Sequence, residues 1–198
     1  MNIRFFAILA SFCLTSISYA DVVVSFSTSA SDPNAGTVLT LNEGQTSASL
    51  FVYVENTEAT TIEGLSLDIL SDTPGIALAT SHLISEPAGR WFGSTPGALG
   101  SGPFLVDDSN AFNFFGGFPN SGGPQLHSEI VLDAIGIGST QVTAATGGSG
   151  IAVGGQVPSS LSFGTATVNV VTAIPEPGSA FALSAIVGGM LIRRRKSH

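Results

Sequence analysis

The stretch Ile62-Glu-Gly-Leu-Ser-Leu-Asp-Ile-Leu70 alternates apolar and polar side chains over most of its length. Successive side chains of a β-strand point to opposite faces of the sheet, so Leu65, Leu67 and Ile69 share one face. The polar residues between them lie on the other face. This alternation predicts a strand that places one face on a hydrophobic core.

Further segments of this kind lie on both sides of the central strand. They are rich in Val, Thr and aromatic residues, which favour strands, and Gly, Asn and Pro separate them. The expected strands cover residues 22–28, 37–41, 49–55, 126–135, 139–144 and 161–171, with turns at 32–36 and 42–44. Many short strands separated by turns predict an all-β fold, an antiparallel β-sandwich or jelly roll.

The middle of the chain, residues 74–125, is rich in Gly, Pro and Ser. It predicts irregular structure with only short β-like pieces, such as 104–106 and 111–115. Phe112 and Phe114 alternate within the second piece, and we expect them to pack in the core.

Trp91 follows Arg90, which is the one base between the two ends of the chain. An aromatic ring beside a cation is a plausible contact for a sugar ligand in an extracellular sandwich. Trp91 and Arg90 are therefore candidate ligand-binding residues, and packing of the aromatic residues in the core is the alternative that we favour.

The first 20 residues have the pattern of a secretory signal peptide. Arg4 precedes an apolar run from Phe5 to Leu14, and Ser18-Tyr-Ala20 is a cleavage site with small residues at its first and third positions. The pattern predicts export through the Sec machinery and removal of residues 1–20 by signal peptidase. Cys13 would leave with the signal, so the expected exported domain, residues 21–172, contains no disulfide.

The predicted exported region is strongly acidic. Between Asp21 and Pro177 one base faces 14 acidic residues, a formal charge of −13. Such a surface repels nucleic acid, so nucleic-acid binding is excluded as a function. It attracts divalent cations, and a cluster of hard oxygen ligands forms a candidate calcium site, although the cluster lacks an EF-hand pattern. Its residues are Asp107, Asp108 and Asn110.

The C-terminal segment, residues 173–198, has three consecutive parts. Residues 179–192 carry no charge, and as a helix they would span about 21 Å, less than the hydrocarbon core of a bilayer at about 30 Å. Two prolines precede this helix in the motif Pro175, Glu176 and Pro177. A basic cluster follows it, which the positive-inside rule keeps in the cytoplasm: Arg193, Arg194, Arg195 and Lys196.

This order of parts resembles the PEP-CTERM sorting signal of exported bacterial proteins. The resemblance implies recognition of Pro175, Glu176 and Pro177 by an exosortase-like transpeptidase, after transient anchoring in the membrane. It also implies a final place at the cell surface or in the extracellular matrix, in association with exopolysaccharide or biofilm. An ordinary C-terminal membrane helix after a proline-rich linker is the alternative.

A second resemblance covers residues 37–68 and 129–142. A strand, an Asn-Glu-Gly turn, a Phe-Val-Tyr-Val strand and a Gly-Leu-Ser-Leu-Asp strand are similar to the opening of cohesin-type and related carbohydrate-binding sandwiches. The resemblance implies the fold and no particular binding residue.

The sequence offers little for catalysis. It has no Gly-x-Ser-x-Gly elbow, and His82 and His127 are the imidazoles of the exported region. We therefore expect a non-enzymatic structural or adhesive surface protein. The alternative is a carbohydrate-binding or cohesin-like protein-recognition module with calcium-assisted loops. A hydrolase would require one of the histidines to meet a carboxylate in a pocket.

Overall fold

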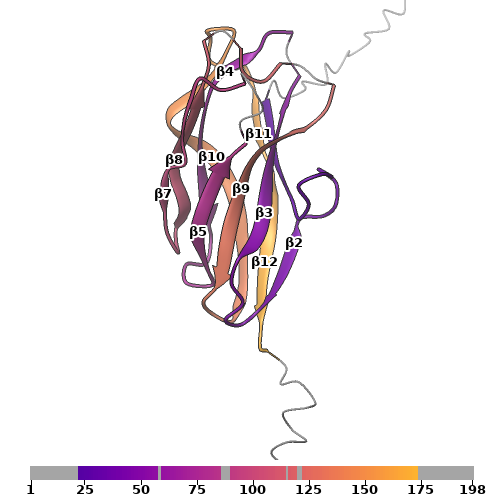
Figure 1. Ribbon diagram of the computed structural model, residues 1–198, viewed down its shortest axis with the longest axis vertical. Helices are drawn as coiled ribbons and strands as arrows, with labels where there is room; N and C mark the ends of the chain where they lie inside the picture. The colour runs from indigo at the N-terminus through magenta and orange to yellow at the C-terminus, as the bar shows by residue number, and fades with distance from the viewer. Residues whose placement is uncertain (1–21, 58, 86–89, 115, 120–121, 174–198) are drawn as a thin grey trace, which may run out of the picture.

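The computed structural model describes residues 22–57, 59–85, 90–114, 116–119 and 122–173. These residues form two β-sheets that pack face to face, with most strands running along the long axis of the molecule (Figure 1). One sheet has five strands, in the order β11 (Leu161–Phe163), β1 (Val22–Ser27), β3 (Ala48–Asn56), β9 (Gln125–Ala134) and β5 (Ala77–Ile84).

The second sheet has seven strands and carries the candidate site. Its order is β2 (Val38–Asn42), β12 (Thr165–Val171), β10 (Gly138–Val153), β4 (Ile62–Ser71), β8 (Phe104–Phe112) and β6 (Gly93–Thr95), with β7 (Ala98–Leu99) also paired to β8. The all-β sandwich predicted from the sequence is confirmed.

The core lies between the sheets and follows the predicted alternation. Leu65, Leu67 and Ile69 of β4 are each 1% exposed. They face inward with residues of the five-stranded sheet such as Val52 and Ile130, which are fully buried. Burial of these apolar side chains is the main force that holds the sheets together.

The last strand segment connects the two sheets. The sequence predicts one strand over residues 161–171, but the structure divides it at Gly164. The first part, β11, runs parallel to β1, and the second part, β12, pairs with β10 and β2 in the other sheet. The Gly164 N–H donates to Val24 O at 2.7 Å, and a Cβ on Gly164 would lie 3.2 Å from that oxygen. Glycine at position 164 therefore allows the chain to pass close to β1 as it moves from one sheet to the other.

The middle of the chain is more regular than predicted. Residues 74–125 contain β5, β6 and β7, and the expected fragment 104–106 is part of the continuous strand β8. Strand β5 is hard to see in the sequence because a register shift between Ala79 and Ser81 interrupts its alternation.

The described residues contain no helix, and within them nothing is long and apolar enough to cross a membrane as one. The predicted signal peptide, residues 1–20, lies outside the described part. So do the sorting motif 175–177, the apolar helix 179–192 and the basic cluster 193–196.

Candidate functional site

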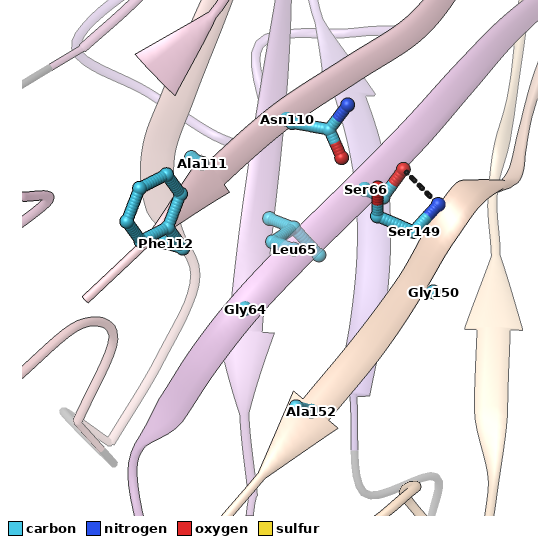
Figure 2. Close-up of a pocket in the computed structure, with 9 residues that line it drawn as sticks. All are labelled: Gly64, Leu65, Ser66, Asn110, Ala111, Phe112, Ser149, Gly150 and Ala152. Atoms are coloured by element: carbon cyan, nitrogen blue, oxygen red, sulfur yellow. Dashed lines mark hydrogen bonds between the residues drawn. The ribbon is translucent and has the colours of Figure 1, made fainter. Parts of the chain in front are cut away.

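The outer face of the seven-stranded sheet has a shallow pocket of about 270 Å³ across β4, β8 and β10. Figure 2 shows the ring of Phe112 on one side of it and the hydrogen-bonded pair Ser66 and Ser149 on the other. Small side chains form much of its surface. The lining residues are Gly64, Leu65, Ser66, Asn110, Ala111, Phe112, Ser149, Gly150 and Ala152.

A bulge in β10 builds one wall of this pocket. Thr146 pairs with Leu67 and Ile151 with Leu65, so β10 advances five residues while β4 advances two. The extra residues lie close over Ser66, where the Ser149 N–H donates to Ser66 Oγ at 3.3 Å. A Cβ on Gly147 would be 2.4 Å from the same oxygen, so the close approach requires glycine there.

A second pocket of about 290 Å³ lies on the other side of the bulge. It shares Ser149, Gly150 and Ala152 with the first pocket and includes Val157, which is 84% exposed. The bulge therefore lies between two neighbouring depressions and contributes residues to both.

Asp108 fastens the bulge to the sheet from β8. Its backbone has a φ of 52°, and its N–H donates to Asp68 Oδ1 at 2.8 Å. Its Oδ1 accepts hydrogen bonds from Ser66 Oγ at 3.1 Å and from the Gly148 N–H at 2.9 Å. The hydrogen bond from Ser66, followed by one from the Asn110 side chain, holds the pKa of Asp108 below its ordinary value.

The predicted calcium ligands are only partly brought together. Asn110 Nδ2 donates to the backbone oxygen of Asp108, whereas Asp107 pairs with Ala98 of β7. In the described ranges no three His, Cys, Asp or Glu side chains are grouped as a metal site requires. Because Asp108 Oδ1 already accepts two donors, it is a poor calcium ligand in this arrangement, and calcium binding stays a prediction.

Three phenylalanines form an exposed aromatic patch next to the pocket. Phe92, Phe112 and Phe114 are 80%, 41% and 73% exposed. The ring of Phe112 is 6.4 Å from that of Phe92 and 5.7 Å from that of Phe114, between centroids. Gly93, paired with Phe112, leaves room for this ring, because a Cβ there would lie 2.8 Å from Phe112 Cζ. We call these three residues the aromatic patch.

The prediction that Phe112 and Phe114 pack in the core is wrong. Ala111 is the residue of this segment that faces inward, opposite Leu65 of β4, so Phe112 points outward. Phe114 follows the end of β8. Phe118, which follows a few residues later, is fully buried, and Phe115 lies outside the described residues.

The structure places one candidate ligand residue, Trp91, in the core and the other, Arg90, above the ring of Phe118. Trp91 is 7% exposed and packs inside, with its ring 5.3 Å from that of Phe118. The Arg90 guanidinium carbon lies 4.2 Å above the Phe118 ring, and its nitrogens donate to Gln125 and to the backbone of Leu126. A ligand at this surface would therefore meet Phe92, which was not among the predicted binding residues, and not the face of Trp91.

The two histidines lie in the core and not in the pocket. His127 is 1% exposed, and burial lowers its pKa to about 3, with His82 and Arg90 contributing. Burial likewise lowers the pKa of His82, whose Nδ1 is 2.7 Å from Pro96 O. The His127 ring contacts the rings of Trp91 and Phe118, and among the described residues His82 Nε2 and His127 Nδ1 have no hydrogen-bond partner. Within the described residues neither of these two nitrogens is therefore held by a carboxylate, as the base of a hydrolytic triad is.

Comparison with known proteins identifies the fold. No protein-family profile and no curated protein sequence matches the chain. Among solved structures, it is similar to the cohesin module of a Clostridium perfringens family 33 glycoside hydrolase, with a TM-score of 0.53 and 9% identity over 78% of this chain and 100% of that one.

Two further cohesins have comparable similarity. The seventh ScaB type I cohesin of Pseudobacteroides cellulosolvens has a TM-score of 0.51 and 11% identity, over 78% of this chain and 95% of that chain. A non-cellulosomal cohesin of the archaeon Archaeoglobus fulgidus has a TM-score of 0.50 and 11% identity, over 78% and 93%. The chain thus has a cohesin-like β-sandwich fold, as the weaker of the two sequence resemblances implies.

Proposed function

We propose that this chain is an exported, non-catalytic recognition module that binds a protein partner on the outer face of its seven-stranded sheet. The observation that carries the proposal is the aromatic patch beside the pocket at β4, β8 and β10. The cohesin-like fold supports a binding role and not a catalytic one, because the cohesin of Clostridium perfringens is a separate module of an enzyme chain.

The aromatic patch has a physical reason to be covered. Two of its rings are more than 70% exposed and all three lie together, so water contacts a continuous apolar surface. Removing such a surface from water is favourable by about 25 cal/mol per Å². Exposed apolar clusters with a polar rim are typical of sites of protein–protein contact, and aromatic residues are enriched there.

The site fits a protein better than it fits a sugar. The platform is made of Phe, which lacks the polar edge of Trp and Tyr, and the neighbouring pocket is shallow and lined by small residues. At its far end, Ser66 Oγ already bonds to Asp108 Oδ1, which lies outside the pocket lining, and both oxygens bond to the bulge. They have limited capacity left to hold sugar hydroxyls.

Charge narrows the kind of partner. The exported region has one base against 14 acidic residues. Its field repels an acidic protein and increases the association rate of a basic one. We therefore expect a partner with an apolar side chain for the aromatic patch and a neutral or basic surface around it.

Delivery completes the proposed function. Residues 1–20 would direct the chain to the Sec machinery and signal peptidase, and residues 173–198 would be a PEP-CTERM signal read by an exosortase-like enzyme. The patterns that support this are the cleavage site at Ala20, the motif Pro175-Glu-Pro177 and the basic end. The module would then act at the cell surface or in an extracellular matrix of polysaccharide.

Site-specific photo-crosslinking in the native host tests the docking surface. A crosslinking residue replaces Phe114 in one strain and Leu83, which is 58% exposed on β5 of the other sheet, in a control strain. We expect a protein that crosslinks from position 114 and not from position 83. Its affinity for the purified chain is then measured by calorimetry.

The variants Phe92→Ala and Phe114→Ala should each weaken that affinity at least tenfold, and Leu83→Ala less than twofold. Equal crosslinking from both positions, or affinity that is unchanged by either phenylalanine variant, would contradict the proposal. If the wild type binds a glycan and the phenylalanine variants do not, the ligand of the aromatic patch is a sugar and not a protein.

A further inference from the structure

A glycine in strand β4 forms part of the floor of the pocket beside the aromatic patch. Gly64 pairs with Phe112 of β8 on one side and with Ala152 of β10 on the other. Because Leu65 faces the core, its neighbour Gly64 faces outward, and Phe112, Gly64 and Ala152 all line the pocket. This row of paired residues therefore has a large ring at one end and no side chain in its middle.

The ring of Phe112 covers a different glycine. Gly93 of β6 also pairs with Phe112, and a Cβ on Gly93 would lie 2.8 Å from Cζ of that ring. An aromatic ring that lies over a strand glycine shields the exposed backbone. The Cβ position of Gly64 has Ala152 Cβ as its neighbour at 3.7 Å, and the Phe112 ring lies farther away. Within the described residues, Gly64 is thus a strand glycine without an aromatic cover.

The backbone at position 64 does not require glycine. The pairing of β4 with β10 is irregular next to it, between Ala152 and Val153, but the φ of Gly64 lies outside the left-handed range that favours glycine. A Cβ there would make an ordinary van der Waals contact, unlike one at Gly147, which would lie 2.4 Å from Ser66 Oγ. Glycine inside a strand often marks a bulge, a tight bend or a close approach by a ligand. Since the local backbone does not explain Gly64, a close approach by a ligand does.

The space above Gly64 has room for one aromatic side chain. The pocket volume is about 270 Å³, and a cavity of about 150 Å³ is enough for one benzene molecule. An inserted ring would lie on the glycine backbone, with the Phe112 ring on one side and the methyl group of Ala152 on the other. Aromatic rings in such contact attract one another beyond the effect of buried area alone.

One polar group of the pocket is suited to a hydrogen-bond donor. The side-chain nitrogen of Asn110 donates to Asp108 O at 3.0 Å, and Figure 2 shows the oxygen of the same amide on the side of Leu65 and Ser66. That oxygen can accept a hydrogen bond from a group in the pocket. Tryptophan and tyrosine carry a donor at the edge of the ring, whereas phenylalanine does not.

We propose that the pocket above Gly64 binds a tryptophan or tyrosine side chain of the partner, with the ring on the glycine backbone and the N–H or O–H donated to Asn110. The inference rests on the proposed docking function and names the side chain by which the partner is held. Tryptophan and tyrosine are enriched among the residues that contribute most to interface affinity, which sit in closely packed pockets. The acidic charge of the exported region favours basic residues beside that anchor.

Indole, the ring of tryptophan, tests the pocket without a known partner, and toluene, which has no donor, is its control. Each is titrated into the natively processed, ¹⁵N-labelled protein, and NMR follows the backbone amides of Gly64 and Ala152 and the side-chain amide of Asn110. We expect saturable shifts of all three signals by indole, with a Kd of about 1 mM for a ligand of this size. Absence of a saturable shift at Gly64 up to about 10 mM indole would overturn the proposal.

Gly64→Val fills the pocket from its floor. Valine favours a strand more than glycine does, so the midpoint of thermal unfolding should stay or rise, whereas indole binding should weaken at least tenfold. Ser162→Val, at an exposed position on β11 of the other sheet, is the matched control and should leave indole binding unchanged. Should Gly64→Val fail to fold, Ala152→Val narrows the same pocket from β10. Indole that binds the filled pocket as tightly as the wild type would refute the site.

Asn110→Ala tests the hydrogen bond. It should weaken indole binding at least threefold and leave toluene binding unchanged, because toluene has no donor for the amide oxygen. Equal losses for the two compounds would mean that Asn110 only shapes the pocket, which would contradict the proposed recognition of a donor.

The protein that crosslinks from position 114 separates this inference from the proposed function. Its affinity should fall at least tenfold in Gly64→Val, and by a similar factor when the anchoring tryptophan or tyrosine of the partner is replaced by alanine. A partner whose affinity is unchanged by Gly64→Val would retain the docking surface and refute the anchor. Saturable indole binding at Gly64 without any crosslinked protein would refute the docking function and retain the aromatic pocket.

Discussion

Phe114 and Phe118 are four residues apart, yet the first is 73% exposed and the second fully buried. The difference comes from their neighbours and not from their chemistry. Phe118 pairs with Ile62 through backbone hydrogen bonds, and its ring packs under Arg90 and beside Trp91. Residue type alone therefore cannot predict which of the two phenylalanine rings is buried.

The two positions provide a matched pair of stability variants. Phe118→Ala leaves a cavity in the core and removes the ring on which Arg90 and Trp91 pack, so we expect it to lower the free energy of unfolding by about 3–5 kcal/mol. Phe114→Ala removes an exposed ring and should change it by less than about 0.5 kcal/mol. Urea denaturation measures both, and equal losses would mean that Phe114 is also part of the core.

Asp108 should titrate below the ordinary aspartate range, because Ser66, Asn110 and the bulge backbone donate to its charged form. A lowered folded-state pKa means that these bonds stabilise the protein above pH 4 and are lost as the pH falls through that pKa. Carbon-detected NMR of the carboxyl group gives the value. Ser66→Ala removes the largest contribution and should raise it, whereas Ser94→Ala on β6 should leave it unchanged.

At the scale of elements, the bulge in β10 decides the shape of the site. It places Gly147 and Gly148 against Ser66 and Asp108 and so separates the two pockets. Bulges commonly re-aim side chains near functional sites. Within the bulge, the Ser149 N–H donates a hydrogen bond to Ser66 Oγ of β4.

Gly147→Ala tests this close approach. Its Cβ would lie 2.4 Å from Ser66 Oγ, so we expect a loss of about 1–3 kcal/mol in the free energy of unfolding. Gly123→Ala is the control, because a Cβ there meets nothing within 4 Å. If the contact is the cause, the cost of Gly147→Ala should be smaller in a Ser66→Ala background, and a thermodynamic cycle of the two substitutions would measure the difference.

The sequence predicts those elements in which the period of two is uninterrupted. Strand β4 is an example, because Leu65, Leu67 and Ile69 are directly visible as a face. Strand β5 is not predictable in this way, since small and polar residues fill it and its register shifts after Ala79. Consecutive glycines at 147 and 148 are a usable signal for the bulge, because glycine within a strand often marks one.

The site was less predictable than the fold. Its aromatic patch depends on Ala111 facing inward and on Gly93 making room for Phe112, and both are properties of pairing between distant strands. Trp91 is the conspicuous residue in the sequence, but Phe92 takes the exposed position. A local pattern cannot tell which of two adjacent aromatic residues points outward when the segment has no regular alternation.

At the scale of the whole molecule, the two ends of the chain and the sandwich have separate tasks in the proposed function. The strands of the sandwich span Val22 to Val171, and the predicted sorting motif lies outside the described residues. Five of the six basic residues lie in the two end segments, so removal of those segments would leave the acidic module. In the proposed function, charge would thus distinguish the two ends, which would contact the membrane machinery, from the acidic module between them.

Replacing Pro175, Glu176 and Pro177 together by alanine tests this division. Alanine would extend the apolar helix and remove the extended backbone at the membrane boundary, so a processing enzyme could no longer bind it. We expect the variant to stay in the membrane fraction with His198 intact, and the wild type to reach the cell surface without it. Mass spectrometry of the mature C-terminus distinguishes the two.

In a host that lacks the sorting enzyme, the wild-type chain should also stay in the membrane fraction with His198 intact. An intact His198 on wild-type protein at the cell surface would contradict processing. Because the substitution leaves residues 22–173 unchanged, the variant should keep the Trp91 emission of the wild type, which separates a sorting defect from a folding defect.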